Sequence, residues 1–328
     1  MLSVQRPLHG DGWQTGVMQN NVDFKLVGGA VRALVWAWLL AGTSHVLAQT
    51  ASASELESGK NAAGLLEKHA ALDKQLGKTA FGRPLVLEST EDAGSVSGNA
   101  YAVVDASFDT VSTTFKSSNY WCEVIILHIN TKYCRASTEG SPAVLKVNIG
   151  KKTPQELADA FALEFAMRQV ASTPRYLAVH LNAEKGPLGT NNYRIELQAV
   201  PLPSGKTFMH LRYAYGFGVA GRLAMQGYLA TVGSGKVGFT HINGDSKQGY
   251  IGGMRGVVER NTVRYYLAIE AFLASLSRAP AQRLNARLEH WFDATEQFAL
   301  QLHETDRSSY LAMKREEHLR QQTLAVVR

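Results

Sequence analysis

The sequence is poor in the features that mark several common classes of protein. Its formal net charge is +6, but no run of lysines and arginines stands out, so nucleic-acid binding is not expected. The longest apolar run is well short of the roughly 20 residues that a membrane-spanning helix needs. The 45% hydrophobic and 19% charged residues are instead typical of a globular chain. Its mildly basic balance also suits contact with an anionic membrane surface.

Motifs for metal, nucleophile and nucleotide chemistry are missing as well. The histidines form neither HExxH nor HxH pairs, so no metal site and no cofactor is expected. The turn 94–98 has Val96 where a nucleophile elbow needs serine. The stretch ATVGSGKV, 230–237, looks like a phosphate-binding loop, but Val237 occupies the place of the magnesium-binding hydroxyl. We therefore expect no nucleotide.

The N-terminal segment is typical of a secretory signal peptide. Lys25 and Arg32 precede the apolar run 33–42, and small residues follow at a cleavage spacing before position 48. We predict a signal peptide at 1–48, with Met18 as an alternative start; the other interpretation is an interior core helix. No cysteine follows the apolar run directly, so the mature protein is expected to be periplasmic or secreted and not lipid-anchored.

The two cysteines, Cys122 and Cys134, are the only ones in the chain. In an oxidising compartment a pair twelve positions apart can close one disulfide. The chain-entropy model gives such a short loop a stabilisation of roughly 3 kcal/mol. The alternative is a pair of buried free thiols, which behave as small hydrophobic groups.

Alternation of apolar and polar residues predicts an antiparallel sheet with one buried face. In 207–215, Met209, Leu211, Tyr213 and Tyr215 alternate with more polar neighbours. The same pattern occurs at 143–148, 176–181 and 193–198, and we predict further strands at 84–88, 99–105, 124–127 and 237–242.

Helical spacing of apolar residues predicts several helices. These lie at 60–76, 107–121 (one or two short helices, capped by Asp105 or Ser107), 154–168, 219–230, 252–276, 280–302 and 308–324. The helix at 154–168 is predicted from its start signals, Thr153 as cap, Pro154 at the first position and Glu156 as capping-box partner. Alternation is also visible in 158–168, but the cap favours a helix.

One stretch resembles a known family. Residues 101–115, YAVVDASFDTVSTTF, followed by Asn119-Tyr120-Trp121, are similar to the opening of the START-related helix-grip family, in which a strand leads into a helix that ends at a tryptophan. Lipid-transfer domains, polyketide cyclases and pollen allergens share this fold. The resemblance covers about 99–276 and implies an α+β fold, a curved antiparallel sheet wrapped on a long C-terminal helix.

With extra helices at both ends, the expected organisation has four parts. They are a signal peptide at 1–48, a linker and N-terminal helix at 49–80, a helix-grip-like domain at 81–278 with an insertion at 219–253, and a C-terminal helical extension at 279–328. The signal peptide, the helix at 154–168, the insertion and the terminal helices depart from the family pattern.

A sheet wrapped on a helix leaves an apolar gap in which aromatic hydroxyls can orient a guest. By alternation, the expected inward side chains are Tyr193, Tyr213 and Tyr215, joined by Tyr265 of the long helix. The alternative is a filled core in which each hydroxyl reaches the rim. Trp121 is a further candidate lining residue, although packing beside the disulfide also explains it.

Arg264 is the candidate for the polar end of a ligand. Arg260 and Arg264 are four residues apart on the long helix and repel unless an acidic or anionic group lies between them. A ligand can supply that charge, and so can an acidic residue of a neighbouring element. Together these features predict non-catalytic binding or carriage of an apolar or amphipathic small molecule, such as a lipid, in the cell envelope. The alternatives are a cyclase- or hydrolase-type enzyme using the same cavity, and an envelope protein whose tail helices bind a partner.

Overall fold

The computed structural model describes residue 57 and residues 59–137, 142–231 and 233–326. These belong to one compact unit, Ser54–Arg328. The predicted signal peptide lies outside the described residues. Within the described part of the chain, no helix is both long enough and apolar enough to cross a membrane.

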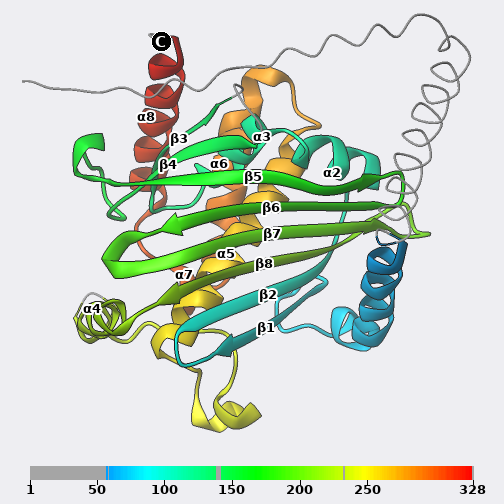
Figure 1. The fold of residues 1–328 in the computed structure, drawn as a ribbon, viewed down its shortest axis with the longest axis horizontal. Helices are drawn as coiled ribbons and strands as arrows, with labels where there is room; N and C mark the ends of the chain where they lie inside the picture. Colours follow the sequence, from blue (N-terminus) through cyan, green and yellow to red (C-terminus); the bar gives the residue numbers. More distant parts are fainter. Residues whose placement is uncertain (1–56, 58, 138–141, 232, 327–328) are drawn as a thin grey trace, which may run out of the picture. The chain divides into compact units, whose positions relative to one another are not determined.

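Eight antiparallel strands form one sheet (Figure 1). They are β1 (Leu85–Glu91), β2 (Ser95–Val104), β3 (Thr131–Ser137), β4 (Ala143–Ile149), β5 (Phe161–Thr173), β6 (Tyr176–Lys185), β7 (Thr190–Pro201) and β8 (Thr207–Phe217), in the order β1-β2-β8-β7-β6-β5-β4-β3. The chain thus returns from β8 to pair with β2, which places segments more than 100 residues apart side by side. The predicted α+β fold with a curved antiparallel sheet is confirmed.

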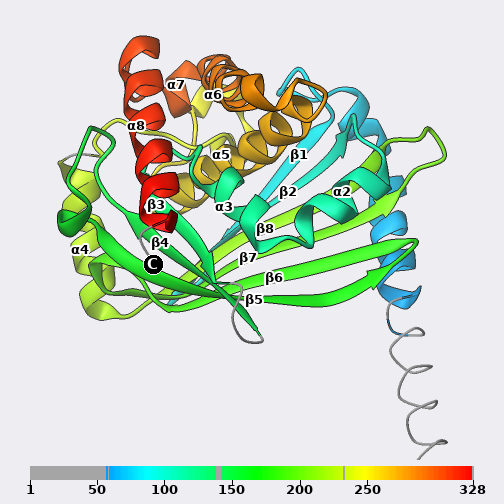
Figure 2. The ribbon, with the colours of Figure 1, turned by 90° about the horizontal axis from the view of Figure 1, so that it is seen from above.

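The helices lie mainly on one side of this sheet (Figure 2). They are α2 (Phe108–Phe115), α3 (Ser118–Ile125), α4 (Val219–Ala230), α5 (Gly253–Ser275), α6 (Pro280–Glu296), α7 (Ala299–Leu302) and α8 (Arg307–Val326), with a further helix over 59–77. The side chain of Ser107 accepts a hydrogen bond from the Thr110 backbone N–H and caps α2, as the sequence predicts.

The long helix α5 packs against the inner face of β1, β2 and β8. The helix and the sheet approach closely at Gly98 of β2, where an added Cβ would lie 2.2 Å from Thr262 Oγ1 of α5. Only glycine allows the helix and the strand to approach so closely at this point.

The helix over 59–77 packs on the opposite, outer face of the sheet. Adjacent strand residues point to opposite faces, so Met209 belongs to the main core and its neighbour Phe208 to a second apolar cluster. Leu65 and Leu72 of this helix complete the second cluster. Where the helix over 59–77 packs, the sheet is therefore covered on both faces.

One helix prediction is wrong. Residues 157–159 form a short 3-10 turn, and Phe161–Thr173 is strand β5 rather than part of a helix at 154–168. Leu163 and Phe165 are buried while Glu164 between them is exposed. This is the alternation visible in the sequence at 158–168, which the helix prediction set aside in favour of the capping residues. Pairing with β4 and β6 on both sides outweighs the local preference for a helix. The helix at 154–168, which we expected as a departure from the family pattern, is therefore not formed.

Two predicted strands are also wrong. Residues 124–125 complete α3, because a short apolar run suits the buried end of a helix as well as a strand. Residues 237–242 form no strand; only His241 pairs, with Tyr250, in an isolated bridge. The N–H groups of Phe239 and Thr240 instead donate to the Glu259 carboxylate at 2.6 and 3.0 Å.

The predicted disulfide is confirmed: Cys122 and Cys134 are joined, with an S–S distance of 2.00 Å. The bond ties α3 to the edge strand β3. Both cysteines are buried in the main core.

The C-terminal helix α8 covers the edge of the sheet at β3. The Tyr310 hydroxyl donates to the Leu127 carbonyl at 2.9 Å, and Gln321 Oε1 accepts from the Cys134 backbone N–H at 3.2 Å. Edge-strand N–H groups are open to pairing with other chains unless something covers them, so α8 protects this edge.

Candidate functional site

A line of aromatic rings runs between the sheet and α5. The ring centroids of Tyr215 and Tyr213 are 5.8 Å apart, those of Tyr213 and Tyr265 5.2 Å, and those of Tyr265 and His128 4.8 Å. Tyr193 stacks on Tyr215 at 5.2 Å. We call these five side chains the aromatic cluster. The structure thus brings together the three tyrosines that alternation predicts to point inward and Tyr265 of the long helix.

Local irregularities in the sheet place Tyr193 within the cluster. The register between β7 and β8 shifts between Asn191 and Arg194, and Asn192 in this bulge has a φ of 50°. A bulge re-aims the side chains beside it. Gly186 completes the space, because a Cβ there would lie 2.1 Å from the Tyr193 ring.

Burial keeps the cluster uncharged. It raises the pKa of Tyr193 to about 12 and raises those of Tyr213, Tyr215 and Tyr265 as well, so all four hydroxyls stay protonated at neutral pH. Burial, together with the positive charges of Arg264 and Lys314, lowers the pKa of His128 well below its usual value. The histidine is therefore neutral.

Two polar groups of the cluster are buried without a protein partner. The Tyr215 hydroxyl and His128 Nε2 have no hydrogen bond within the described part of the chain, and the two side chains are 3% and 5% exposed. The other ring nitrogen, Nδ1, accepts from the Asn130 backbone N–H at 3.3 Å, so Nε2 carries the proton of the neutral ring. Buried polar groups are nearly always hydrogen-bonded, so these two stand out.

Asn261 of α5 connects the aromatic cluster to nearby charges. Its side chain acts on the pKa of both Tyr213 and His128, in each case against the larger effect of burial. Asn261 Oδ1 also accepts from Arg264 Nη1 at 3.4 Å.

Arg264 has an acidic partner from a neighbouring element. Its Nη2 lies 2.6 Å from Glu304 Oε1, in the segment between α7 and α8. Lys152 Nζ lies 2.6 Å from the same oxygen, and Lys236 Nζ lies 3.5 Å from Glu304 Oε2. The protein therefore supplies the acid that the sequence left open, but it places three cations around it.

Trp121 lies outside the line of rings. It is 1% exposed, its ring packs 5.1 Å from that of Phe115, and its Nε1 donates to the Phe115 carbonyl at 3.0 Å. Its polar atom is already used, so these contacts describe a packing residue beside the disulfide.

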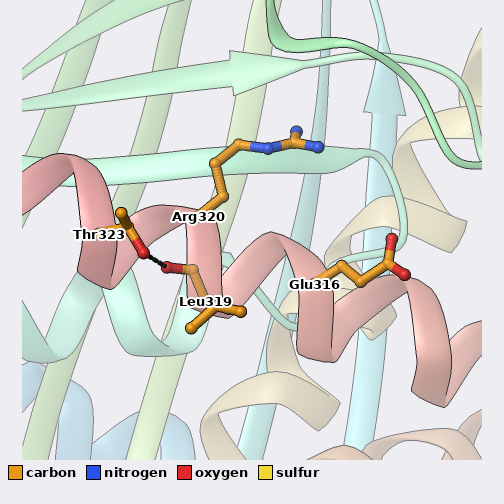
Figure 3. A pocket seen from close by; sticks show the side chains of 4 residues that line it. All are labelled: Glu316, Leu319, Arg320 and Thr323. Carbon is orange, nitrogen blue, oxygen red and sulfur yellow. Dashed lines mark hydrogen bonds between the residues drawn. The ribbon is translucent and has the colours of Figure 1, made fainter.

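Two surface hollows lie away from the cluster. One is on α8 and is lined by Glu316, Leu319, Arg320 and Thr323 (Figure 3). Leu319 there is 65% exposed, while Thr323 Oγ1 donates back to the Leu319 carbonyl of its own helix. This hollow contains no residue of the aromatic cluster.

The second hollow lies between the helix over 59–77 and the outer face of the sheet. Its lining includes Tyr101, Gln198 and His210, which are register partners on three neighbouring strands. Tyr101 stacks on His210 at 4.4 Å, and burial lowers the pKa of His210 to about 4. His210 and Arg212 share this outer face of β8. Arg212 Nη1 forms an ion pair with Glu196 Oε2 at 3.2 Å, so its charge has a structural partner.

Sequence reasoning missed His128 and Asn261. His128 follows the apolar run 124–127, and nothing in its spacing connects it to Tyr265, 137 positions later. Asn261 was visible only as a polar residue between two arginines of the long helix. In the described part of the chain, no three His, Cys, Asp or Glu side chains gather closely enough to hold a metal ion.

Comparison with known proteins gives matches among solved structures alone. No family model matches the chain, and no curated protein matches it. The solved structures that it resembles include norcoclaurine synthase from Thalictrum flavum (16% identity, 45% of this chain and 91% of the other, TM-score 0.30) and human StAR-related lipid transfer protein 5 (10%, 74% and 98%, 0.27). A conserved protein of unknown function from Enterococcus faecalis also matches (7%, 63% and 91%, 0.30). These solved structures include a START-related lipid transfer protein, as the sequence resemblance leads us to expect.

Proposed function

We propose that the protein is exported and binds or carries an apolar or amphipathic small molecule, such as a lipid, between the sheet and α5. The observation that carries this proposal is the pair of buried groups without protein partners, the Tyr215 hydroxyl and His128 Nε2, at the two ends of one line of rings. An unpartnered buried donor costs about 1–3 kcal/mol. A ligand that brings an acceptor oxygen would remove this cost.

The cluster has the composition of a small-molecule site. Four tyrosine rings and one imidazole give it an aromatic surface with a few polar groups, a mixture that is common in ligand pockets. Tyr193, Tyr213 and Tyr265 retain 7%, 5% and 7% of their exposed surface although they lie deep in the molecule. Apolar burial would supply the affinity, and the hydroxyls would orient the guest.

Binding fits the protonation states better than acid–base catalysis does. His128 is neutral, its Nδ1 is occupied by the Asn130 N–H, and its Nε2 carries a proton. No lone pair of the ring is left to abstract a proton. The tyrosines are held protonated by burial, so they too can donate hydrogen bonds. A site made of donors is suited to holding an acceptor.

Export is part of this proposal, on two grounds. The segment 1–48 has the pattern of a signal peptide. The Cys122–Cys134 bond belongs to a kind that persists in oxidising compartments. The net charge of +6 further leads us to expect loading at an anionic membrane surface.

Native mass spectrometry of protein purified from the exported fraction, compared with the same sample after denaturation, tests the proposal. We expect an adduct that denaturation releases, and a denatured mass that corresponds to cleavage after Ala48. The variant Tyr213→Phe/Tyr215→Phe removes two hydroxyls at constant ring size and should lower adduct occupancy. Tyr101→Phe on the outer face is the matched control and should leave it unchanged. A mass without adduct, together with no binding of added decanoate or 1-decanol, would refute the proposal.

A further inference from the structure

We propose that the ligand is an amphipathic anion, whose carboxylate or phosphate group binds a cationic cluster formed by Lys152, Lys236 and Arg264 around Glu304. This inference rests on the proposed function, because it assigns the charged end of the same ligand. The shared chemistry is that of an oxyanion, and the experiment below separates an amphiphile from free phosphate.

Four segments distant in the sequence meet at this cationic cluster. Lys152 follows β4, Lys236 lies in the glycine-rich turn after α4, Arg264 is in α5, and Glu304 lies between α7 and α8. Lys236 also donates to the His303 carbonyl at 2.6 Å. The turn that resembles a phosphate-binding loop thus contributes its lysine to the cationic cluster, and helix α4 leads into this turn where a phosphate-binding loop has a strand.

The charges of the cationic cluster are unbalanced. Three cations surround one carboxylate, and the side chains of Arg264 and Glu304 are only 3% and 8% exposed. Burial and the neighbouring charges of Arg264 and Lys236 lower the pKa of Lys152, although Glu304 acts in the opposite direction. Cations that are partly removed from water and lie close together are stabilised by binding a further anion.

Two further charged residues of α5, Arg260 and Glu259, contact the segment that follows Lys236. Arg260 adds another cation, whose Nη1 donates to the Val237 carbonyl at 3.0 Å. Glu259 is a buried acid of this segment, and its oxygens already accept from Phe239, Thr240 and Ser89.

A polar path joins the cationic cluster to the aromatic cluster. Arg264 directly precedes Tyr265 in α5, and its Nη1 donates to Asn261, which in turn acts on Tyr213 and His128. The backbone carbonyl of Arg264 accepts from Trp291 Nε1 at 3.1 Å, which fixes this turn of the helix. A ligand can therefore lay an apolar body along the rings while its anionic end reaches the lysines.

Calorimetric titration of the exported, disulfide-bonded protein tests this assignment. Decanoate and 1-decanol have chains of equal length and differ in charge. We expect decanoate to bind about tenfold more tightly, since hydrogen bonds to charged groups are stronger than those between neutral groups. Lys152→Met and Lys236→Met should each reduce this preference, and so should added salt. Lys247→Met, at an exposed lysine of the same insertion, is the matched control and should have no effect.

The outcomes separate the two proposals. If both probes bind equally and the lysine variants match the control, the anion site is wrong while ligand binding stands. If neither probe binds, both proposals fail. Inorganic phosphate that competes with decanoate and depends on Lys152 and Lys236 supports the assignment. Phosphate that binds without affecting decanoate would overturn it in favour of a separate site for free anions. Circular dichroism of each variant checks that the fold is retained.

Discussion

Lys314 and Glu317 form an ion pair inside the protein, with a distance of 2.7 Å from Nζ to Oε2 and side chains that are 0% and 3% exposed. Lys132 binds the other carboxylate oxygen at 2.9 Å, so two buried cations share one anion. Lys314 Nζ also donates to the carbonyls of His128 and Thr131 at 2.7 and 2.6 Å. This arrangement attaches α8 to the edge of the sheet and holds the backbone of a residue of the aromatic cluster.

The buried Lys314 should make stability depend on pH. Burial lowers its pKa to about 8, although Glu317 opposes the effect, while an unfolded lysine titrates near 10.4. Between these values the unfolded chain binds more protons, so the free energy of unfolding should rise with pH. We expect the wild-type protein to gain stability relative to Lys314→Met from pH 8 to pH 10, as measured by urea unfolding. A pH-independent difference between the two proteins would contradict this.

The disulfide should contribute measurably to stability. Reduction, or the change Cys122→Ala/Cys134→Ala, should lower the free energy of unfolding by about 3 kcal/mol, because the loop becomes free in the unfolded chain. Urea unfolding with and without a phosphine reductant measures this. The double variant should not respond to the reductant; a wild-type protein that also fails to respond would show that the bond contributes nothing.

Gly98 should not tolerate a side chain. In Gly98→Ala the new Cβ would meet Thr262 Oγ1 at 2.2 Å, and overpacking of this kind costs about 1–3 kcal/mol. Gly94→Ala is the matched control in the same hairpin, since its added Cβ would lie 3.6 Å from the Phe217 carbonyl oxygen, an ordinary contact distance. Thermal unfolding should show a loss for position 98 only. Adding Thr262→Ala should restore part of the loss, and no such coupling would argue against a steric cause.

Glu259 should hold the segment after the glycine-rich turn. Its carboxylate accepts from the Phe239 and Thr240 N–H groups and from two hydroxyls, and the residue is fully buried. Glu259→Gln places an N–H₂ group among these donors, which should cost about 1–3 kcal/mol. Hydrogen exchange at residues 239–240 should accelerate in this variant. Glu164→Gln, at an exposed pair with Lys146, should change neither exchange nor stability appreciably.

Much of this structure could be predicted from the sequence because the signals are local. Alternation placed Tyr193, Tyr213 and Tyr215 on one face of the sheet, since a strand has a period of two residues. Helical spacing located α5 and with it Tyr265. The spacing of the two cysteines allowed the disulfide. Each of these depends on neighbours within about a dozen residues.

Only the tertiary structure decided the rest, because it depends on contacts between distant residues. The segment just before strand β5 carries the start signals of a helix, but pairing with β4 and β6 makes residues 161–173 a strand. His128 joins the tyrosines because the turn after α3 lies beside α5, a relationship with no trace in sequence spacing. Lys152, Lys236 and Arg264 come from segments up to 112 residues apart in the sequence, and only folding brings their charges together around Glu304.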